Sequence, residues 1–308
     1  MDTSTTEHRP VVVGMDESDS ARHAAEWAAD IAAAWRAPLC LVHTVLGERS
    51  DAPVATVPTW LRELLDAADR AGAGPLNTEI VPGGTVDLLE ERSADARLLV
   101  LGSYGDGAWS GMLAGSTALA LIGRAACPAA VVRGSSPQIP PPRGGPVVVG
   151  VDDSAAGAAA LEFAADLAES IGARLIAVHA WSEVVVDASD RVRRLPDGGD
   201  VLAARGTALL DAHLAPVLAR HTGLRVERHV IEDNPLRALL DRARSARLLV
   251  VGHRGSTPSH RMLLGSTSHA LVEFAPCPVV VTKPATRMDD TPRAAEQSAL
   301  ITPPGSAC

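Results

Sequence analysis

The chain has 308 residues and a net charge of −9, and 46% of its residues are apolar and 21% charged. This length favours two domains over one, and the apolar share is typical of a globular protein with a sizeable core. The acidic excess argues against partners that bind through bulk positive charge, so no nucleic-acid and no membrane partner is expected. We expect no apolar run to approach the roughly 18 residues that a membrane-spanning helix needs.

Residue types that are rare in the chain exclude several kinds of site. The four cysteines lie far apart without C-x-x-C spacing, which argues against a disulfide framework and a zinc site. Lys283 is the only lysine, so the Gly-Lys-Ser/Thr sequence of a Walker A loop is absent. The N-terminus is polar and lacks the apolar region of a signal peptide, so a cytoplasmic location is expected.

Strand and helix patterns alternate along the first half of the chain. A strand at residues 11–15 leads into a helix that begins at Ser18 or Ser20 and ends near Trp35. Because the strands are mostly continuous apolar runs, the predicted fold class is α/β, with a parallel sheet covered by helices on both faces. The other elements are predicted as strands at 38–43, 76–81, 98–101 and 129–132 and helices at 59–71, 85–94 and 116–126.

The same order restarts in the second half. Val147-Val-Val-Gly-Val-Asp-Asp-Ser154 repeats Val11-Val-Val-Gly-Met-Asp-Glu-Ser18, which predicts an internal duplication. The second half is longer between about Trp181 and Arg205, a stretch predicted to be a surface loop. The predicted boundaries are a disordered N-terminus (1–9), domain 1 (10–134), a Pro/Gly-rich linker (135–145), domain 2 (146–284) and a disordered tail (285–308).

A glycine motif follows the fourth strand of each half. Gly102-Ser-Tyr-Gly105 is followed after nine residues by Gly115-Ser-Thr117, and Gly252-His-Arg-Gly255 after nine by Gly265-Ser-Thr267. Glycine lets the backbone approach a phosphate, and the start of the following helix offers unpaired N–H groups. The pattern therefore predicts an anion cradle, although the Ser and Thr hydroxyls could instead serve as helix N-caps.

The aspartate after the first strand is expected to face this cradle. Doubly wound sheets bind ligands where the strand order reverses, and in the order 3-2-1-4-5 strands 1 and 4 flank that point. Asp16 and Asp152 end strand 1 in the two halves. A carboxylate opposite a phosphate cradle suits a nucleotide, since it can accept a ribose hydroxyl or help to hold Mg²⁺. The alternative is that both aspartates are only helix caps.

These features make the chain resemble a tandem universal stress protein of the ATP-binding type. The resemblance rests on Gly-x2-Gly-x9-Gly-Ser/Thr in both halves, on the Val-Gly-x-Asp-x-Ser openings, and on Val-His at strand 2. It implies two domains of five parallel strands each, with ATP as ligand and Mg²⁺ on its phosphates. The residues that it assigns to ATP binding are Gly14, Asp16, Thr44, Leu101, Gly102, Gly105, Gly115, Ser116 and Thr117 in domain 1, and Gly150, Val151, Asp152, Ala180, Val251, Gly252, Arg254, Gly255, Gly265, Ser266 and Thr267 in domain 2.

The chain departs from the family pattern at two positions, and the glycine loops of its two halves differ in charge. Arg97 and Arg247 precede strand 4, where the family commonly has an acid. Domain 2 is predicted to bind ATP more tightly, because cations favour a triphosphate and a carboxylate opposes it. The residues concerned are Arg254, Ser256, His260 and Arg261 in domain 2, at the positions of Tyr104, Asp106, Ser110 and Gly111 in domain 1.

The function that the resemblance implies is nucleotide-dependent regulation of stress survival or dormancy. Slow ATP hydrolysis is compatible with the sequence, but no convincing general base or nucleophile for an efficient enzyme is identified. His43 and His179 are interpreted as packed strand residues. The alternatives left open are a binder of another adenine nucleotide such as cyclic AMP and a nucleotide-independent interaction module. The two domains are expected to pair through their fifth strands, with a homodimer as a further option.

Overall fold

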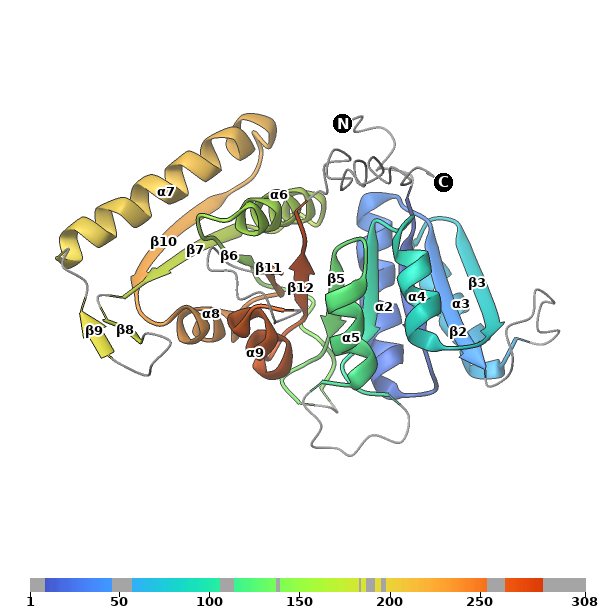
Figure 1. Ribbon diagram of the computed structural model, residues 1–308. Coiled ribbons are helices and arrows are strands. Elements are labelled where there is room, and N and C mark those ends of the chain that lie inside the picture. The colour runs from blue at the N-terminus through green and yellow to red at the C-terminus, as the bar shows by residue number, and fades with distance from the viewer. Residues whose placement is uncertain are drawn as a thin grey trace, which may run out of the picture.

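The computed structural model describes residues 9–45, 57–105, 114–136, 139–182, 184–186, 192–194, 198–253 and 264–284. Helices and strands alternate through both halves of the chain (Figure 1). The elements of the first half are β1 (Val11–Met15), α2 (Asp19–Trp35), β2 (Leu39–Val45), α3 (Thr59–Arg70), β3 (Leu76–Pro82), α4 (Thr85–Ser93), β4 (Leu98–Gly102), α5 (Ser116–Arg124) and β5 (Ala129–Val132).

The second half repeats this order with two additional short strands. Its elements are β6 (Val147–Gly150), α6 (Ala155–Ser170), β7 (Leu175–Trp181), β8 (Val184–Val186), β9 (Val192–Arg194), α7 (Gly199–Arg220), β10 (Val226–Glu232), α8 (Pro235–Ala243), β11 (Leu248–Gly252), α9 (Ser266–Phe274) and β12 (Val279–Thr282). The predicted α/β class and the alternation are confirmed, with helix ends that differ from the predictions by one or two residues.

The strands of both halves form one continuous sheet of ten strands, in the order β10-β7-β6-β11-β12-β5-β4-β1-β2-β3. Within each half the strands are parallel and follow the predicted order 3-2-1-4-5. The halves join where β12 pairs antiparallel with β5, with Val280 opposite Ala130. The expected pairing of the fifth strands is therefore confirmed, and it merges the two predicted sheets into one.

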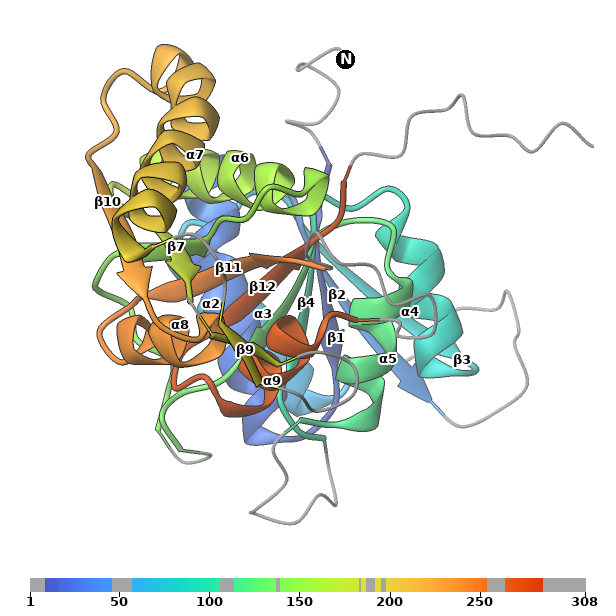
Figure 2. The same ribbon diagram turned by 60° about the vertical axis from the view of Figure 1, so that its left-hand side comes forward.

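Each face of this sheet carries its own hydrophobic core. Successive residues of a strand point to opposite faces, so Val11 and Val13 pack against α2 and α3 while Val12 packs against α4 and α5. In the second half α6 and α7 cover the first of these faces and α8 and α9 the other (Figure 2). Because the junction is antiparallel, the carboxyl ends of the two sets of strands lie at opposite edges of the sheet.

The predicted loop between Trp181 and Arg205 is wrong in part. Val184–Val186 and Val192–Arg194 pair antiparallel as a small separate sheet, and α7 already begins at Gly199. The Pro-Asp-Gly-Gly sequence that suggested a loop stands just before this helix, and Gly198 is its N-cap. The Pro-Asp-Gly-Gly sequence thus marks a helix boundary, which the sequence pattern alone does not distinguish from a turn.

The expectation about membrane-spanning segments also needs correction. Within the described residues, α7 is the one helix that is long and apolar enough to cross a membrane, with a mean hydropathy of 1.2 over 18 residues. This is weak evidence for a membrane span, because it rests only on the length and composition of the helix. Alanines contribute much of the apolar character, and the helix packs Leu210, Leu214 and Val217 into the core against β7 and β10.

Most of the predicted disordered ends lie outside the described residues. Of the N-terminal segment (1–9) only Arg9 is described, and the predicted tail (285–308) is not described at all. These two expectations stay predictions.

Candidate functional site

The aspartate after the first strand of each half holds the residue that caps the next helix. Asp16 Oδ1 accepts hydrogen bonds from the Ser18 amide at 3.0 Å and the Ser18 hydroxyl at 2.5 Å. The Ser18 oxygen in turn accepts a hydrogen bond from the Ala21 amide at 3.1 Å and caps α2. Ser18, and not Asp16 or Ser20, is therefore the N-cap.

The second half repeats this arrangement. Asp152 Oδ1 accepts from the Ser154 amide at 3.2 Å and from the Ser154 hydroxyl at 2.5 Å. Ser154 caps α6 by accepting from the Gly157 amide at 2.9 Å. The idea that the two aspartates are only helix caps is thus wrong, since a serine performs that role in each half.

The first glycine of each motif permits a close approach between the loop and the neighbouring helix. A Cβ on Gly102 would lie 2.6 Å from Ser20 Oγ and 2.9 Å from the Ser20 carbonyl carbon. A Cβ on Gly252 would lie 2.7 Å from the carbonyl carbon of Ala156, the residue equivalent to Ser20. Both glycines are required by packing at the helix N-terminus, which places the loop next to the aspartate.

In the first half, the Ser20 hydroxyl orients this loop. It accepts hydrogen bonds from the Ser103 amide at 2.7 Å and the Tyr104 amide at 3.3 Å. A Cβ on Gly105 would lie 2.8 Å from Asp16 Oδ2, so the carboxylate is directed at the second glycine of the motif. The predicted meeting of aspartate and glycine loop across one crevice is what the structure shows in the first half.

The third glycine begins the helix that follows the loop. The Gly115 amide donates to the Ser103 carbonyl at 2.7 Å, and the Gly265 amide donates to the His253 carbonyl at 2.9 Å. Both glycines are N-caps without a side-chain capping bond. Ser116 and Thr117, like Ser266 and Thr267, therefore lie in the first helical turn and are not the N-caps.

The strand-2 histidines fasten the end of the first strand. His43 Nδ1 donates to the Met15 carbonyl and His179 Nδ1 donates to the Val151 carbonyl, each at 2.9 Å. Because a carbonyl can only accept, the Nδ1 atom carries the proton in both rings. Trp60 contacts the His43 ring edge-on, with centroids 5.1 Å apart. These contacts support the interpretation of both histidines as packed strand residues.

The predicted residues of the first half surround one cavity of about 480 Å³, which is within the range of small-molecule sites. Every site residue that the sequence analysis assigned to domain 1 lines it. The cavity is lined by Gly14, Met15, Asp16, Ala21, His43, Thr44, Thr85, Leu89, Leu101, Gly102, Tyr104, Gly105, Gly115, Ser116, Thr117 and Ala118. The carboxyl ends of β1, β2 and β4 and the N-termini of α4 and α5 thus converge on this cavity.

Thr85 is a cavity residue that the sequence analysis missed. It begins α4, and its Oγ1 lies 2.6 Å from Thr44 Oγ1, so the two hydroxyls form a hydrogen-bonded pair. Ala180 and Pro235 stand at the equivalent positions of the second half and carry no hydroxyl. The only sequence signal was that Thr85 follows two glycines at a predicted helix start.

The second half is described only in part at its glycine loop. The residues placed as in the first half are Gly150, Val151, Asp152, Ala180, Val251, Gly252, Gly265, Ser266 and Thr267. Arg254 and Gly255 lie outside the described residues, as do Asp106, Ser110, Gly111, Ser256, His260 and Arg261. The predicted difference in affinity between the two domains therefore stays a prediction.

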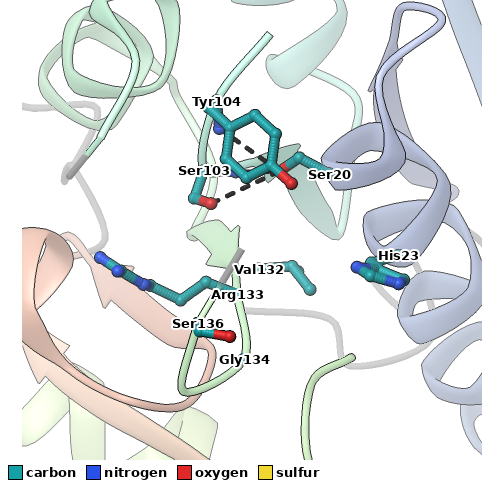
Figure 3. A pocket seen from close by; sticks show the side chains of 8 residues that line it. All are labelled: Ser20, His23, Ser103, Tyr104, Val132, Arg133, Gly134 and Ser136. Atoms are coloured by element: carbon teal, nitrogen blue, oxygen red, sulfur yellow. Dashed lines mark hydrogen bonds between the residues drawn. The ribbon is translucent and has the colours of Figure 1, made fainter. Parts of the chain in front are cut away.

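A second, much smaller pocket lies behind the glycine loop of the first half (Figure 3). Its volume of about 10 Å³ is close to what one water molecule needs. Ser20, Ser103 and Tyr104 line it from the loop side, and Arg133 and Ser136 from the segment after β5. Tyr104 lines both this pocket and the large cavity.

Metal ligands are not concentrated in the described part of the chain. Among the described residues, no group of three or more His, Cys, Asp or Glu side chains could hold a metal ion. The carboxylate of Asp16 at the glycine loop is suited to a ribose hydroxyl, or to a divalent cation that phosphates also bind.

Comparisons with known proteins agree on one family. A sequence model described as the universal stress protein family matches residues 7–133 and 145–283. Universal stress protein Rv2623 of Mycobacterium tuberculosis is 35% identical over 299 residues, covering 89% of this chain and 96% of that protein. Universal stress protein Rv2005c of the same species is 37% identical over 291 residues, with the same two coverages.

The solved structures show the same fold. A universal stress protein from Archaeoglobus fulgidus DSM 4304 matches with a TM-score of 0.62 and 18% sequence identity. The match covers 89% of this chain and 98% of that chain. At this identity the likeness concerns the fold alone.

Proposed function

Because the chain belongs to the universal stress protein family, we propose that it binds ATP at the carboxyl edge of the strands in both halves. Through that binding it acts as a nucleotide-dependent regulator of stress survival or dormancy. Any ATP hydrolysis is slow and is not the main activity.

One observation carries this proposal. Every residue that the family resemblance assigns to ATP in the first half lines a single cavity of about 480 Å³, although these residues come from four separate elements and the segments that follow them. A cavity of this size accommodates a nucleotide, and its wall combines apolar strand residues with backbone amides at a helix N-terminus.

The cavity residues divide into three groups by their chemistry. Leu101 and Thr44 form the part suited to the base, since they offer an apolar surface and a hydroxyl. Asp16 receives a ribose hydroxyl. The amides of the glycine loop and the first turn of α5, which contains Ser116 and Thr117, hold the phosphates.

Mg²⁺ fits this arrangement as a companion of the phosphates. The Asp16 carboxylate is directed at Gly105, where it would repel a phosphate unless a cation lies between them. When bound, the ion would neutralise phosphate charge. Asp16 and the Ser116 and Thr117 hydroxyls are the residues that would face it.

The titratable side chains of the cavity support slow turnover. Among the described lining residues these are Asp16, His43 and Tyr104. Asp16 Oδ1 accepts two hydrogen bonds from Ser18, and His43 Nδ1 donates to the Met15 carbonyl. Asp16 Oδ1 and His43 Nδ1 are thus engaged in structural hydrogen bonds, which leaves these two atoms poorly suited to activating water.

The first experiment measures nucleotide that co-purifies with the protein. The full chain is purified without added nucleotide and denatured, and released adenine nucleotides are quantified by chromatography. The expected result is ATP at one to two molecules per chain. Release of no nucleotide, together with no gain in melting temperature on adding Mg-ATP, would contradict the proposal.

A titration with ATP, ADP and cyclic AMP then identifies the preferred ligand. ATP is expected to bind most tightly, because the glycine loop and the start of α5 offer amides to a chain of phosphates. Tighter binding of cyclic AMP would contradict ATP as the preferred ligand and support the alternative that the chain binds cyclic AMP. The variants Asp16→Ala and Asp152→Ala are each expected to remove one of two sites.

A further inference from the structure

The residue after the last strand of each half reaches across the junction to a helix of the other half. Lys283 Nζ, after β12, donates to the Gly123 carbonyl at 2.9 Å and to the Ala125 carbonyl at 2.5 Å. Arg133, after β5, donates from Nη1 to the Glu273 carbonyl. Lys283 and Arg133 are equivalent positions 150 residues apart, as are Glu273 and Gly123.

The two acceptor helices are those that begin at the glycine motifs. Gly123 and Ala125 lie at the end of α5, and Glu273 lies at the end of α9. The last carbonyls of a helix have no partner within it and carry partial negative charge. Each cation therefore caps the far end of the helix whose N-terminus carries Ser116 and Thr117, or Ser266 and Thr267, in the opposite half.

The antiparallel junction explains how this crossing arises. Because β5 and β12 run in opposite directions, the carboxyl edge of one half is the edge at which α5 or α9 of the other half ends. Both helices lie next to this junction in Figure 1. A cation after the last strand is thus placed at a helix end of its neighbour.

The Arg133 guanidinium is partly withdrawn from water. Burial lowers the pKa of Arg133. Screening by solvent is weaker at such a position than at the surface, so its charge acts more strongly on the helix end.

We propose that Lys283 and Arg133 are positioning residues for nucleotide binding in the opposite half: Lys283 supports the phosphate helix of the first site and Arg133 that of the second. Neither residue touches the nucleotide. Each holds the C-terminal end of α5 or α9 in place and neutralises its partial negative charge, which strengthens the attraction of the N-terminal end for phosphate. The inference rests on the proposed ATP sites and implies that each half is complete only in the paired chain.

The test measures ATP affinity by calorimetry in full-length chains that keep one site. Asp152→Ala leaves the first site and Asp16→Ala leaves the second. Lys283→Met is expected to weaken ATP binding roughly two- to tenfold in the chain with the first site and to leave the second site unchanged. Arg133→Met is expected to do the reverse. Lys283→Arg and Arg133→Lys should restore the affinity.

Two control variants separate this effect from general changes of charge or domain pairing. Arg143→Met removes a cation that pairs with Glu26 and Asp30 of the first half and that, among the described residues, forms no hydrogen bond or ion pair with α5 or α9. Arg124→Met removes an exposed cation near the end of α5 that is paired with Asp87 and Glu90. Arg143→Met is expected to leave ATP affinity unchanged at either site, and Arg124→Met, which removes an exposed and already paired cation, is expected to weaken the first site less than Lys283→Met does.

The outcomes distinguish the two proposals. If the single-site parents bind no ATP, the proposed function falls and this inference falls with it. If the parents bind but Lys283→Met and Arg133→Met weaken both sites equally, or match Arg143→Met, only the inference is overturned. Lys283→Gln, which keeps a donor without the charge, gives a milder second variant should Lys283→Met lower the melting temperature of the nucleotide-free chain.

Discussion

Arg97 of the first half and Asp166 of the second half form an ion pair of 2.8 Å across the junction. The Arg97 guanidinium also lies 4.0 Å from the centroid of the Trp35 ring, which itself packs edge-on against Phe163. Burial lowers the pKa of Arg247, the equivalent residue of the second half, and the nearby charge of Asp30, which is equivalent to Asp166, acts in the opposite direction. The two arginines that departed from the family pattern thus belong to the contact between the halves.

The substitution Arg97→Met is expected to lower the free energy of unfolding by about 1–2 kcal/mol, because it removes both a cation–π contact and an ion pair. The measurement is guanidinium chloride unfolding of the full chain. Arg143→Met is the matched control, since its side chain is 61% exposed and its ion pairs should contribute about 0–1 kcal/mol. Equal losses for the two variants would argue against a special role for Arg97.

The hydroxyl of Ser20 is expected to maintain the loop of the first site. In Ser20→Ala the Ser103 and Tyr104 amides lose their shared acceptor, which should destabilise the chain by roughly 1–3 kcal/mol and weaken ATP binding at the first site. Thermal unfolding and ATP titration provide the two readouts. Ser170→Ala, at an exposed hydroxyl on α6, should change neither. An unchanged ATP affinity in Ser20→Ala would show that the loop keeps its shape without this contact.

Gly102 should tolerate no side chain. In Gly102→Ala the added Cβ would meet Ser20 Oγ at 2.6 Å, the Ser20 carbonyl carbon at 2.9 Å and the Ala21 amide nitrogen at 3.0 Å, so α2 and the loop must separate. We expect a loss of about 1–3 kcal/mol in unfolding free energy, as for other overpacked sites. Gly144→Ala is the control, because a Cβ there meets nothing within 4 Å. A melting temperature for Gly102→Ala equal to that of Gly144→Ala would contradict the close approach.

Buried thiols are expected to make stability fall in alkaline solution. Burial raises the pKa of Cys40, Cys127 and Cys277 from 9.0 to about 12. Because the folded pKa is the higher one, the stabilisation is fully present below about pH 9 and is lost as the pH rises towards 12. Each thiol should contribute a loss of roughly 1 kcal/mol at pH 10.

The measurement compares guanidinium chloride unfolding at pH 8 and pH 10. Cys277→Ala should reduce the difference between the two pH values by about one third, since the other two buried thiols remain. A second readout is labelling with a thiol reagent at pH 8 in a Cys308→Ser background, where the three remaining thiols should react only on unfolding. Rapid labelling of the folded chain would contradict the raised pKa values.

The duplicated architecture could be predicted because local sequence patterns indicate it. Apolar runs such as residues 98–101 and 248–251, each followed by glycines and a helix start, define an element and its neighbour within about twenty residues. The known preference of doubly wound sheets then places Asp16 opposite Gly105. The domain-1 site residues follow from the resemblance to the family, and all of them line the cavity.

Prediction failed where the decisive contact leaves no local pattern. Thr85 joins the cavity only because α4 begins beside the end of β2, where its hydroxyl meets that of Thr44. The sequence pattern predicts a loop at the start of α7, because Gly198 and Gly199 suit a turn and a helix boundary equally well.

The fold of each half could be predicted from the sequence alone, since hydrophobic periodicity and glycine spacing act over short stretches of chain. The expected pairing of the fifth strands left open its direction, and only the tertiary contacts reveal that β5 and β12 pair antiparallel and that Lys283 meets the end of α5 while Arg133 meets the end of α9. Such partners lie more than 100 residues apart in the chain, so the antiparallel junction brings them together.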